Sequence, residues 1–376
     1  MLDLLIIGAG PAGISAAYEA KKAGLDYVVI EKGLIANTIY NYPVGLTVFS
    51  TTNELEFETG DLKPAREKPT REELLSYYVR FVLDKELNIH TQETVKVVTN
   101  SSPPYEGGVA AASADGVVLL SSVDDGVEQD STKNHPVPIK NIGPPLLRKE
   151  GSFLVTTDKA EYQSKSILFA IGAMDYPRKL NVPGEDLPHV FDHFRETYPW
   201  VKKKALIVGG GNSAGEAALF LAQEGCETTL AIFREQWNNT DPKQGCIKYW
   251  VKEPLEKELQ EHCLNLFFLG KVIEIRDRSV ELESENGESV VLENDVVFVL
   301  IGSDADLTLL KNLGVETENG KYGEVPVYDA ESFETNVAGV YVAGHFTNQR
   351  HIKAAIDAGK TVVAALTKKT RADAAS

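Results

Sequence analysis

Cysteine is scarce in this sequence: its 376 residues include three, Cys226, Cys246 and Cys263. None of them forms a C-x-x-C pair, and three are too few for the disulfide framework of a secreted protein. We therefore expect a reducing compartment and a cytoplasmic location. Cys226 follows one amphipathic helical pattern and Cys263 interrupts another, and both are expected to be small core residues.

Cys246 differs from the other two cysteines because it lies in a polar stretch beside Lys243 and Lys248. Neighbouring positive charge lowers a thiol pKa, which makes Cys246 the one weak candidate for a reactive thiol. The sequence supplies no resolving partner for it, so an inert cysteine is the favoured interpretation.

Long apolar runs and an excess of basic charge are also absent. No run approaches the roughly 18 residues that span a bilayer. Lys and Arg number 38 against 55 Asp and Glu, a formal net charge of −17 that repels a nucleic-acid backbone or an anionic membrane. The segment 1–7 lacks the basic start of a signal peptide. Neither nucleic acid nor membrane is expected as a partner, and no metal ion is expected.

The composition is that of a folded protein, with 43% hydrophobic and 25% charged residues. Because a domain usually has about 100 to 200 residues, the length predicts two domains. Residues 101–150 depart from the rest: they are rich in Pro, Gly, Ser and acidic residues and predict an insertion or long surface loop.

The first 33 residues predict a strand, a Gly-rich turn, a helix and a second strand that ends at Glu31. In this setting Gly8 permits the tight turn, Gly10 lets the backbone approach a pyrophosphate, and Gly13 lets the helix pack on the sheet. Glu31 stands where a carboxylate accepts the ribose hydroxyls of an adenosine. The residues expected at this site are Gly8, Gly10, Pro11, Ala12, Gly13, Glu31 and Lys32.

A second unit of the same plan starts near Lys203, with the turn sequence GGGNSA. Its strand ends in Phe233-Arg234 where the first unit has an acid, and a guanidinium can pair with a 2′-phosphate. NADPH is therefore favoured over NADH, with a solvated surface arginine as the alternative. The residues expected at this site are Gly209, Gly211, Asn212, Ser213, Ala214 and Arg234. The repeat predicts an α/β fold with two Rossmann-type, three-layer nucleotide-binding domains.

Several motifs give the chain a family resemblance: GAGPAG, FAIGAMDYP, VPGEDLPHV, VGGGNSA, DVVFVLIG and TNVAGVYVAG. With them the chain resembles the thioredoxin-reductase-like class of FAD/NAD(P)H oxidoreductases over nearly its whole length apart from 101–150. The stretches IEKGLIANTIYNYP, FSTT and CIKYWVKEPLEKEL are most similar to the YpdA-like branch, which is associated with bacillithiol disulfide reduction.

This resemblance implies an architecture and a set of flavin contacts. It implies an FAD domain of residues 1–178 and 303–376, an inserted NADPH domain of residues 179–302, and a homodimer. A helix beginning at Ile352 is expected to direct its N-terminus at the flavin ring. The residues that the resemblance places near the flavin are Asn37, Tyr42, Gly172, Gly344, His345, Ile352 and Lys353.

The chain departs from the class in its thiols. Ala12 stands where the YpdA-like branch usually carries a cysteine, and both dithiol positions of the related reductases lack cysteine. The flavin itself is therefore expected to be the reacting group. NADPH would pass hydride to FAD, and the acceptor would be a small disulfide or a small redox protein such as a ferredoxin or flavodoxin. A redox-sensing flavoprotein with slow turnover is the further alternative.

Overall fold

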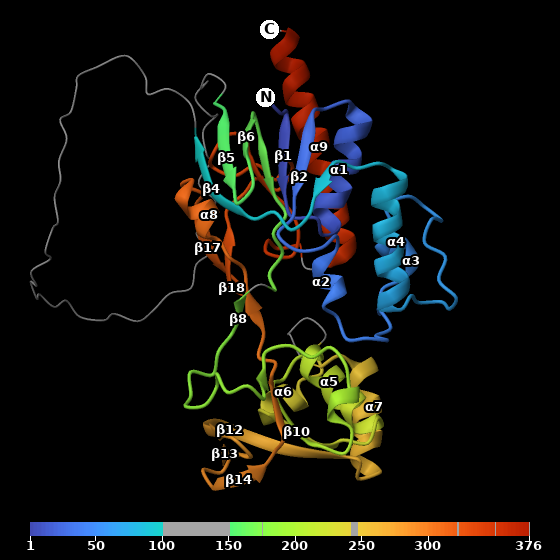
Figure 1. Cartoon of the computed structure of the whole chain (residues 1–376), viewed down its shortest axis with the longest axis vertical. Coiled ribbons are helices and arrows are strands. Elements are labelled where there is room, and N and C mark those ends of the chain that lie inside the picture. Colours follow the sequence, from blue (N-terminus) through green and yellow to red (C-terminus); the bar gives the residue numbers. More distant parts are fainter. Residues whose placement is uncertain (101–150, 175, 242–246, 322, 350, 376) are drawn as a thin grey trace, which may run out of the picture.

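Two large sheets, one of five strands and one of seven, organise the described part of the chain (Figure 1). The computed structural model describes residues 1–100, 151–174, 176–241, 247–321, 323–349 and 351–375. The predicted insertion at 101–150 and Cys246 lie outside these residues. In the part that is described, none of the helices combines the length and the apolar character that a membrane crossing requires.

The first sheet has five strands, and every neighbouring pair is parallel. In sheet order they are β19 (Val340–Val342), β7 (Ile167–Phe169), β1 (Leu4–Ile7), β2 (Tyr27–Ile30) and β3 (Ile89–His90). Along β1, Leu4 and Ile6 join one hydrophobic cluster while Leu5 and Ile7 join another. The strand is apolar throughout because both of its faces are buried.

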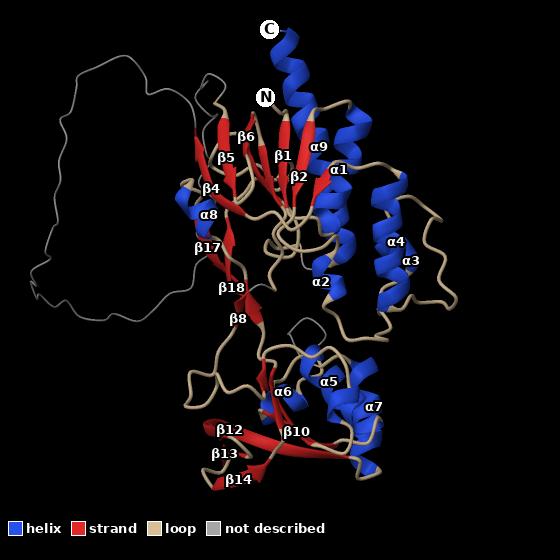
Figure 2. Cartoon of the chain, in the orientation of Figure 1, coloured by secondary structure: helices blue, strands red, loops and turns tan. Residues whose placement is uncertain are grey.

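The two faces of this sheet are covered differently, which gives three layers (Figure 2). Helices cover one face: α1 (Pro11–Ala23), α4 (Arg71–Asp84) and α9 (Ile352–Ala375). An antiparallel sheet and a short helix cover the other: β4 (Val95–Asn100), β5 (Phe153–Thr157), β6 (Glu161–Ser164) and α8 (Thr308–Asn312). We call these layers the first lobe.

Smaller elements complete the first lobe. Two short helices follow β2, and a hairpin follows α8. They are α2 (Asn37–Tyr40), α3 (Thr52–Leu55), β17 (Thr317–Gly320) and β18 (Gly323–Pro326).

The second sheet has seven strands and forms what we call the second lobe. In sheet order they are β14 (Ser289–Glu293), β13 (Ser279–Ser284), β12 (Leu264–Arg276), β11 (Glu227–Ile232), β10 (Lys204–Val208), β15 (Val296–Val299) and β9 (Val190–Phe191). The strands from β12 to β9 pair in parallel, whereas β12, β13 and β14 pair antiparallel.

Helices cover one face of the second sheet, chiefly α5 (Asn212–Gln223) and α7 (Tyr249–Gln260). The antiparallel strands β12 and β13 contribute to the hydrophobic cluster on the opposite face. Two short elements complete the lobe, α6 (Arg234–Asn238) and the 3₁₀ helix η1 (Tyr198–Trp200). Both lobes are therefore α/β layers, as the repeated strand-turn-helix pattern predicts.

The chain crosses between the lobes twice, at one place. The two crossings form an antiparallel pair, β8 (Tyr176–Pro177) with β16 (Ser303–Asp304). Arg178 reinforces it, since its Nη2 lies 2.7 Å from a carboxylate oxygen of Asp304. The predicted domain boundaries fall beside this pair, and the assignment of one cofactor to each lobe stays a prediction.

An aromatic contact joins the lobes below α2. Phe49 of the first lobe stacks on Trp250 of the second, with ring centroids 3.5 Å apart and planes 5° apart. Lys68 Nζ lies 3.4 Å from the centroid of Phe49. Nearby, the Val44 amide donates a hydrogen bond to the Arg195 carbonyl at 2.7 Å. Stacked rings contribute about 0.5 to 1.5 kcal/mol beyond the area they bury.

We predict that Trp250→Ala loosens the arrangement of the lobes, because the stacked pair is lost. Small-angle scattering should show a larger radius of gyration, and the thermal midpoint should also fall because Trp250 packs against the core of its own lobe. Tyr198→Ala is the matched control, since Tyr198 is an aromatic residue of the same lobe with 82% of its surface exposed. An unchanged scattering curve for Trp250→Ala would contradict the prediction.

Candidate cofactor sites

The turn between β1 and α1 contains three glycines, and they differ in what a side chain at each position would contact. Gly8 has φ +107°. A Cβ at Gly8 would lie 2.5 Å from the carbonyl oxygen of Ala170, the residue that follows β7. A Cβ at Gly13 would lie 1.9 Å from the Gly8 carbonyl oxygen. Gly10 instead has no heavy atom within 4 Å of such a Cβ. Packing thus explains two of the glycines, while the third borders open space.

That open space lies at the N-terminus of α1. Gly10 is the N-cap, no side chain caps the helix, and Pro11 occupies its first turn. The backbone N–H groups and positive end of the helix dipole therefore face the space beside Gly10, the arrangement that binds a phosphate. Ala12, in the same turn, is buried, with 3% of its surface exposed. The turn fits the pyrophosphate of a dinucleotide.

Glu31 is held at the same turn. Its side chain is nearly buried, and its carboxylate oxygens accept hydrogen bonds from the Ala9 and Gly33 amides, both at 2.7 Å. These bonds fix the carboxylate beside the glycine turn. Asn37 is close by, because a Cβ at Gly33 would lie 2.8 Å from its amide oxygen. Lys32 follows Glu31 and is exposed.

The other expected flavin residues also collect at this edge of the sheet. Gly172 and Gly344 follow β7 and β19 with φ +71° and +102°. Because β1, β7 and β19 are parallel, the turns after them meet at one edge. A Cβ at Gly344 would lie 3.4 Å from the Ala12 Cβ, so the two turns adjoin. His345, partly buried, comes next.

The helix predicted to begin at Ile352 does so, as α9. Lys353 in its first turn forms an ion pair with Asp357, with nitrogen–oxygen distances of 2.6 and 2.7 Å, so its charge is partly neutralised.

The sequence did not reveal how α9 is fixed on α1. A Cβ at Gly359 would lie 2.4 Å from the Ala12 carbonyl oxygen, and the buried Ser15 hydroxyl donates to the Ile356 carbonyl at 2.7 Å.

The turn between β10 and α5 repeats this geometry in the second lobe. Gly209 has φ +154°, and a Cβ there would lie 2.3 Å from the Leu300 carbonyl oxygen. Among the described residues, no heavy atom lies within 4 Å of a Cβ built at Gly211, the N-cap of α5. Ala214 is fully buried and Ser213 is exposed. The open space again lies at a helix N-terminus, which fits a second pyrophosphate.

A side chain of α6 and the backbone at the start of α7 adjoin this second turn. Asn212 Oδ1 accepts a hydrogen bond from the Lys248 amide at 2.8 Å. A residue that the sequence did not single out is Gln236, whose side-chain oxygen would lie 1.9 Å from a Cβ at Gly210. Its place next to the glycines depends on how α6 folds back, which no short motif signals.

Arg234 stands at the carboxyl end of β11, one strand from this turn. Its guanidinium is paired although 49% of its side chain is exposed. Its Nε donates to Glu285 Oε2 at 2.6 Å, and its Nη2 also pairs with the Glu285 carboxylate. Its guanidinium carbon lies 3.7 Å from the centroid of Phe268. Glu285 and Phe268 were not expected from the sequence, because they reach Arg234 only through the pairing of β12 with β11 and β13.

The two described cysteines differ. Cys226 is buried and its thiol donates to the Trp200 carbonyl at 3.0 Å, and burial with the nearby Glu224 raises its pKa. Cys263 is exposed, so the expectation that it is buried is wrong. Helix α7 ends at Gln260, and Cys263 lies in the turn before β12. Its sulfur and carboxylates of Glu258 and Glu261 lie within 4.8 Å of one another.

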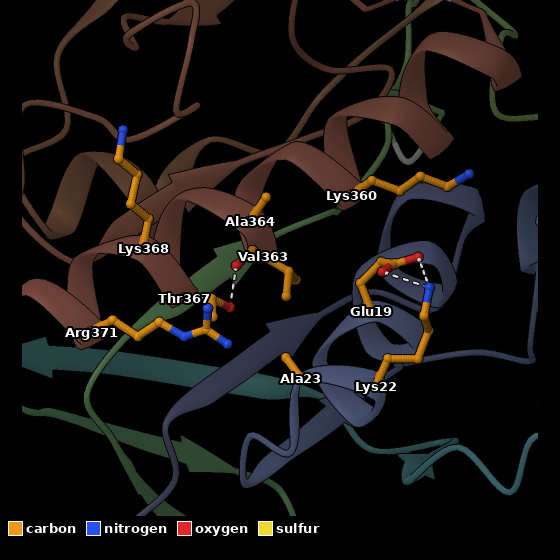
Figure 3. A pocket seen from close by; sticks show the side chains of 9 residues that line it. All are labelled: Glu19, Lys22, Ala23, Lys360, Val363, Ala364, Thr367, Lys368 and Arg371. Carbon is orange, nitrogen blue, oxygen red and sulfur yellow. Dashed lines mark hydrogen bonds and ion pairs between the residues drawn. The ribbon is translucent and has the colours of Figure 1, made fainter.

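A pocket of 460 Å³ lies elsewhere, between the C-terminal half of α1 and α9 (Figure 3). Exposed charged side chains line much of it, and Lys22 Nζ forms an ion pair with Glu19 at 3.1 Å. It is remote from the glycine turn, since α1 runs from Pro11 to Ala23 and the pocket involves its last residues. The pocket is therefore not the cofactor site.

Tyr42 and Glu216 form an electrostatic link between the lobes. Burial raises the pKa of Tyr42, with a smaller contribution from the charge of Glu216 on α5. Burial also raises the pKa of Glu216 from 4.5 to about 7. Both groups are thus disfavoured in their charged forms, as expected where two lobes exclude water from a carboxyl and a phenol.

This carboxyl predicts a pH dependence of stability. Glu216 is neutral in both states below pH 4.5, and the folded state increasingly resists its ionisation as the pH rises to about 7. The free energy of unfolding should therefore fall by roughly 3 kcal/mol between pH 4.5 and 8. In Glu216→Gln the free energy of unfolding, measured by urea unfolding at several pH values, should no longer fall in this way. The control variant Glu253→Gln, on the exposed side of α7, should show the same fall as wild type.

Comparison with known proteins agrees with this geometry. Residues 5–106 and 140–344 match the family model of pyridine nucleotide-disulphide oxidoreductases. The chain is 32% identical to the bacilliredoxin reductase Bdr of Bacillus subtilis over 343 residues, 90% of this chain and 88% of that protein. It is 27% identical to a ferredoxin–NADP reductase of Ignicoccus hospitalis, over 92% of this chain and 90% of that protein.

Among solved structures, the bacillithiol disulfide reductase Bdr (YpdA) of Staphylococcus aureus superimposes with a TM-score of 0.78 at 28% identity, covering 98% of both chains. The two-lobed fold and the two glycine turns are therefore those of a known group of flavoproteins, whose cofactors are FAD and NADPH. The chain belongs to the pyridine nucleotide-disulphide oxidoreductase family and is an FAD-dependent NADPH oxidoreductase.

Proposed function

We propose that residues 1–178 and 303–376 form the FAD domain and residues 179–302 the NADPH domain. The open space beside Gly10 and Gly211 supports one pyrophosphate in each lobe. A carboxylate oxygen accepts more than one hydrogen bond, so Glu31 can also accept from the adenosine ribose of FAD. When bound, FAD supplies the two-electron centre that takes hydride from NADPH.

In the proposed reaction the protein binds the cofactors and shields them from water. The α1 and α9 N-termini supply positive dipole ends to the first lobe's carboxyl edge, where phosphate and flavin charge need stabilisation. The partly buried Tyr42, whose pKa is raised by burial, packs with the hydrophobic cluster of this lobe and keeps water away. Gly344 and Ala12 leave the space near α1 free of larger side chains.

The acceptor that we propose is a disulfide. The observation that carries this is the 32% identity to a bacilliredoxin reductase over 90% of this chain. The overall reaction would consume one NADPH, one proton and one disulfide, and yield NADP⁺ and two thiols. All three cysteines of the sequence lie between positions 226 and 263, outside the proposed FAD domain. We therefore propose that the disulfide is reduced at the flavin without a thiol of this chain.

A redox protein that takes single electrons is the second candidate acceptor. The 27% identity to a ferredoxin–NADP reductase and the lack of cysteine in the proposed FAD domain both support it, since such transfer needs no thiol. A slow redox sensor is the remaining alternative, and steady-state rates with NADPH separate it from an enzyme. We further propose that the protein is a cytoplasmic homodimer, which sedimentation and fractionation would test.

Gly10→Val should yield protein without FAD, because the isopropyl group would occupy the space proposed for the pyrophosphate. The fold itself should survive, since no heavy atom lies within 4 Å of the added Cβ. Gly211→Val is the matched variant: it should keep its FAD but lose reduction of the flavin by NADPH. Flavin absorbance of the purified proteins measures both, and a fully loaded Gly10→Val would overturn the proposed FAD site.

Replacing all three cysteines by serine should leave turnover within about threefold of wild type, since the thiolate exchange that a cysteine mechanism needs would play no part. The assay compares a bacilliredoxin-type or low-molecular-weight disulfide with a ferredoxin, after correction for folded flavoprotein. Cys246→Ser alone is the informative control. If it abolishes disulfide reduction while NADPH still reduces the flavin, a thiol pathway exists. Turnover with ferredoxin alone would favour the second candidate.

A further inference from the structure

Three side chains from separate strands form a fixed cluster at the carboxyl end of β11. Arg234 follows β11, Phe268 lies on β12 opposite Ile232, and Glu285 follows β13. The Glu285 amide donates to the Phe268 carbonyl at 3.0 Å, so these two are held together by the backbone. The pairing of β11 with β12 and this backbone bond therefore set the position of the cluster.

Arg234 is engaged on two sides within this cluster. Its guanidinium stacks over the Phe268 ring at 3.7 Å, and one edge of its fork, Nε and Nη2, pairs with both oxygens of Glu285. The hydrogen bond from Arg234 lowers the pKa of Glu285, which is therefore ionised at neutral pH. About half of the arginine side chain, 49%, and 27% of the glutamate side chain are exposed.

A phosphate would also bind to a guanidinium edge of this kind. A guanidinium binds a phosphate most strongly through two parallel N–H donors, and here one donor pair is already taken by a carboxylate. A 2′-phosphate arriving at Arg234 must displace this carboxylate or bind close to its negative charge. NADH carries no such phosphate and is not subject to either cost.

We propose that Glu285 competes with the 2′-phosphate of NADPH for Arg234 and thereby limits how strongly the enzyme prefers NADPH over NADH. Glu285 is a specificity-determining residue in this proposal, and it acts through Arg234. The inference rests on the proposed binding of NADPH at the β10–α5 turn. Phe268 keeps the guanidinium in place when the carboxylate is displaced.

The test measures kcat/KM for NADPH and for NADH in wild type, Glu285→Gln, Arg234→Ala and the double variant. Glu285→Gln should raise the NADPH/NADH ratio by about tenfold, through a lower KM for NADPH with kcat and the NADH values nearly unchanged. Arg234→Ala should lower the ratio, and adding Glu285→Gln to it should change the ratio by less than about threefold. Glu283→Gln is the matched control, since Glu283 pairs with Lys271 at 3.0 Å and is 32% exposed.

Binding of adenosine 2′,5′-bisphosphate gives a readout that does not depend on hydride transfer. It should tighten in Glu285→Gln relative to wild type, while adenosine 5′-monophosphate binds equally to both. An unchanged or lower NADPH/NADH ratio in Glu285→Gln, with Arg234→Ala still lowering it, would overturn the inference and leave the proposed NADPH site standing. An equal gain in the Arg234→Ala background would also overturn it, because Glu285 would then act directly on the phosphate. No effect of Arg234→Ala would instead contradict the proposed site.

Discussion

Both lobes depend on one close approach, that of a glycine to a backbone carbonyl of the neighbouring strand. After β1, Gly8 passes so near the Ala170 carbonyl that a Cβ would be 2.5 Å from its oxygen, and after β10, Gly209 does the same at Leu300. Both residues have φ values in the region that disfavours side chains. This approach turns the chain directly from strand to helix, which leaves each helix N-terminus facing the carboxyl edge of its sheet.

The edge then determines what else can collect there. Parallel pairing brings the turns after β1, β7 and β19 together, so that Gly8, Gly172 and Gly344 meet although they are far apart in the chain. Parallel pairing of β10 with β11 likewise places Gly211 and Arg234 at one edge of the second sheet. The backbone hydrogen bond from Glu285 to Phe268 brings Glu285 to the same place. A family named for disulphide chemistry is represented here by a chain in which Ala12, and no cysteine, lies in this first turn.

Local signals made much of this predictable. The glycine turns, the apolar strands and the start of α9 at Ile352 follow from patterns within a few residues, and the structure has them where the sequence indicates. The exposure of Cys263 was not foreseen, because it depends on α7 ending at Gln260. The pairing of Arg234 with Glu285 depends on strand pairing between residues about fifty positions apart, and the stacking of Phe49 on Trp250 depends on how the lobes meet. Such contacts have no local pattern from which to predict them.

The crossing at β8 and β16 has a consequence for how such proteins diversify. The second lobe starts and ends at neighbouring positions, since the Arg178 amide donates to the Gly302 carbonyl at 2.9 Å. A segment whose ends meet can be removed or replaced without rerouting the rest of the chain. Mutation or exchange can therefore alter the second lobe, including its β10–α5 turn and Arg234, while the first lobe keeps its own sheet and glycine turn.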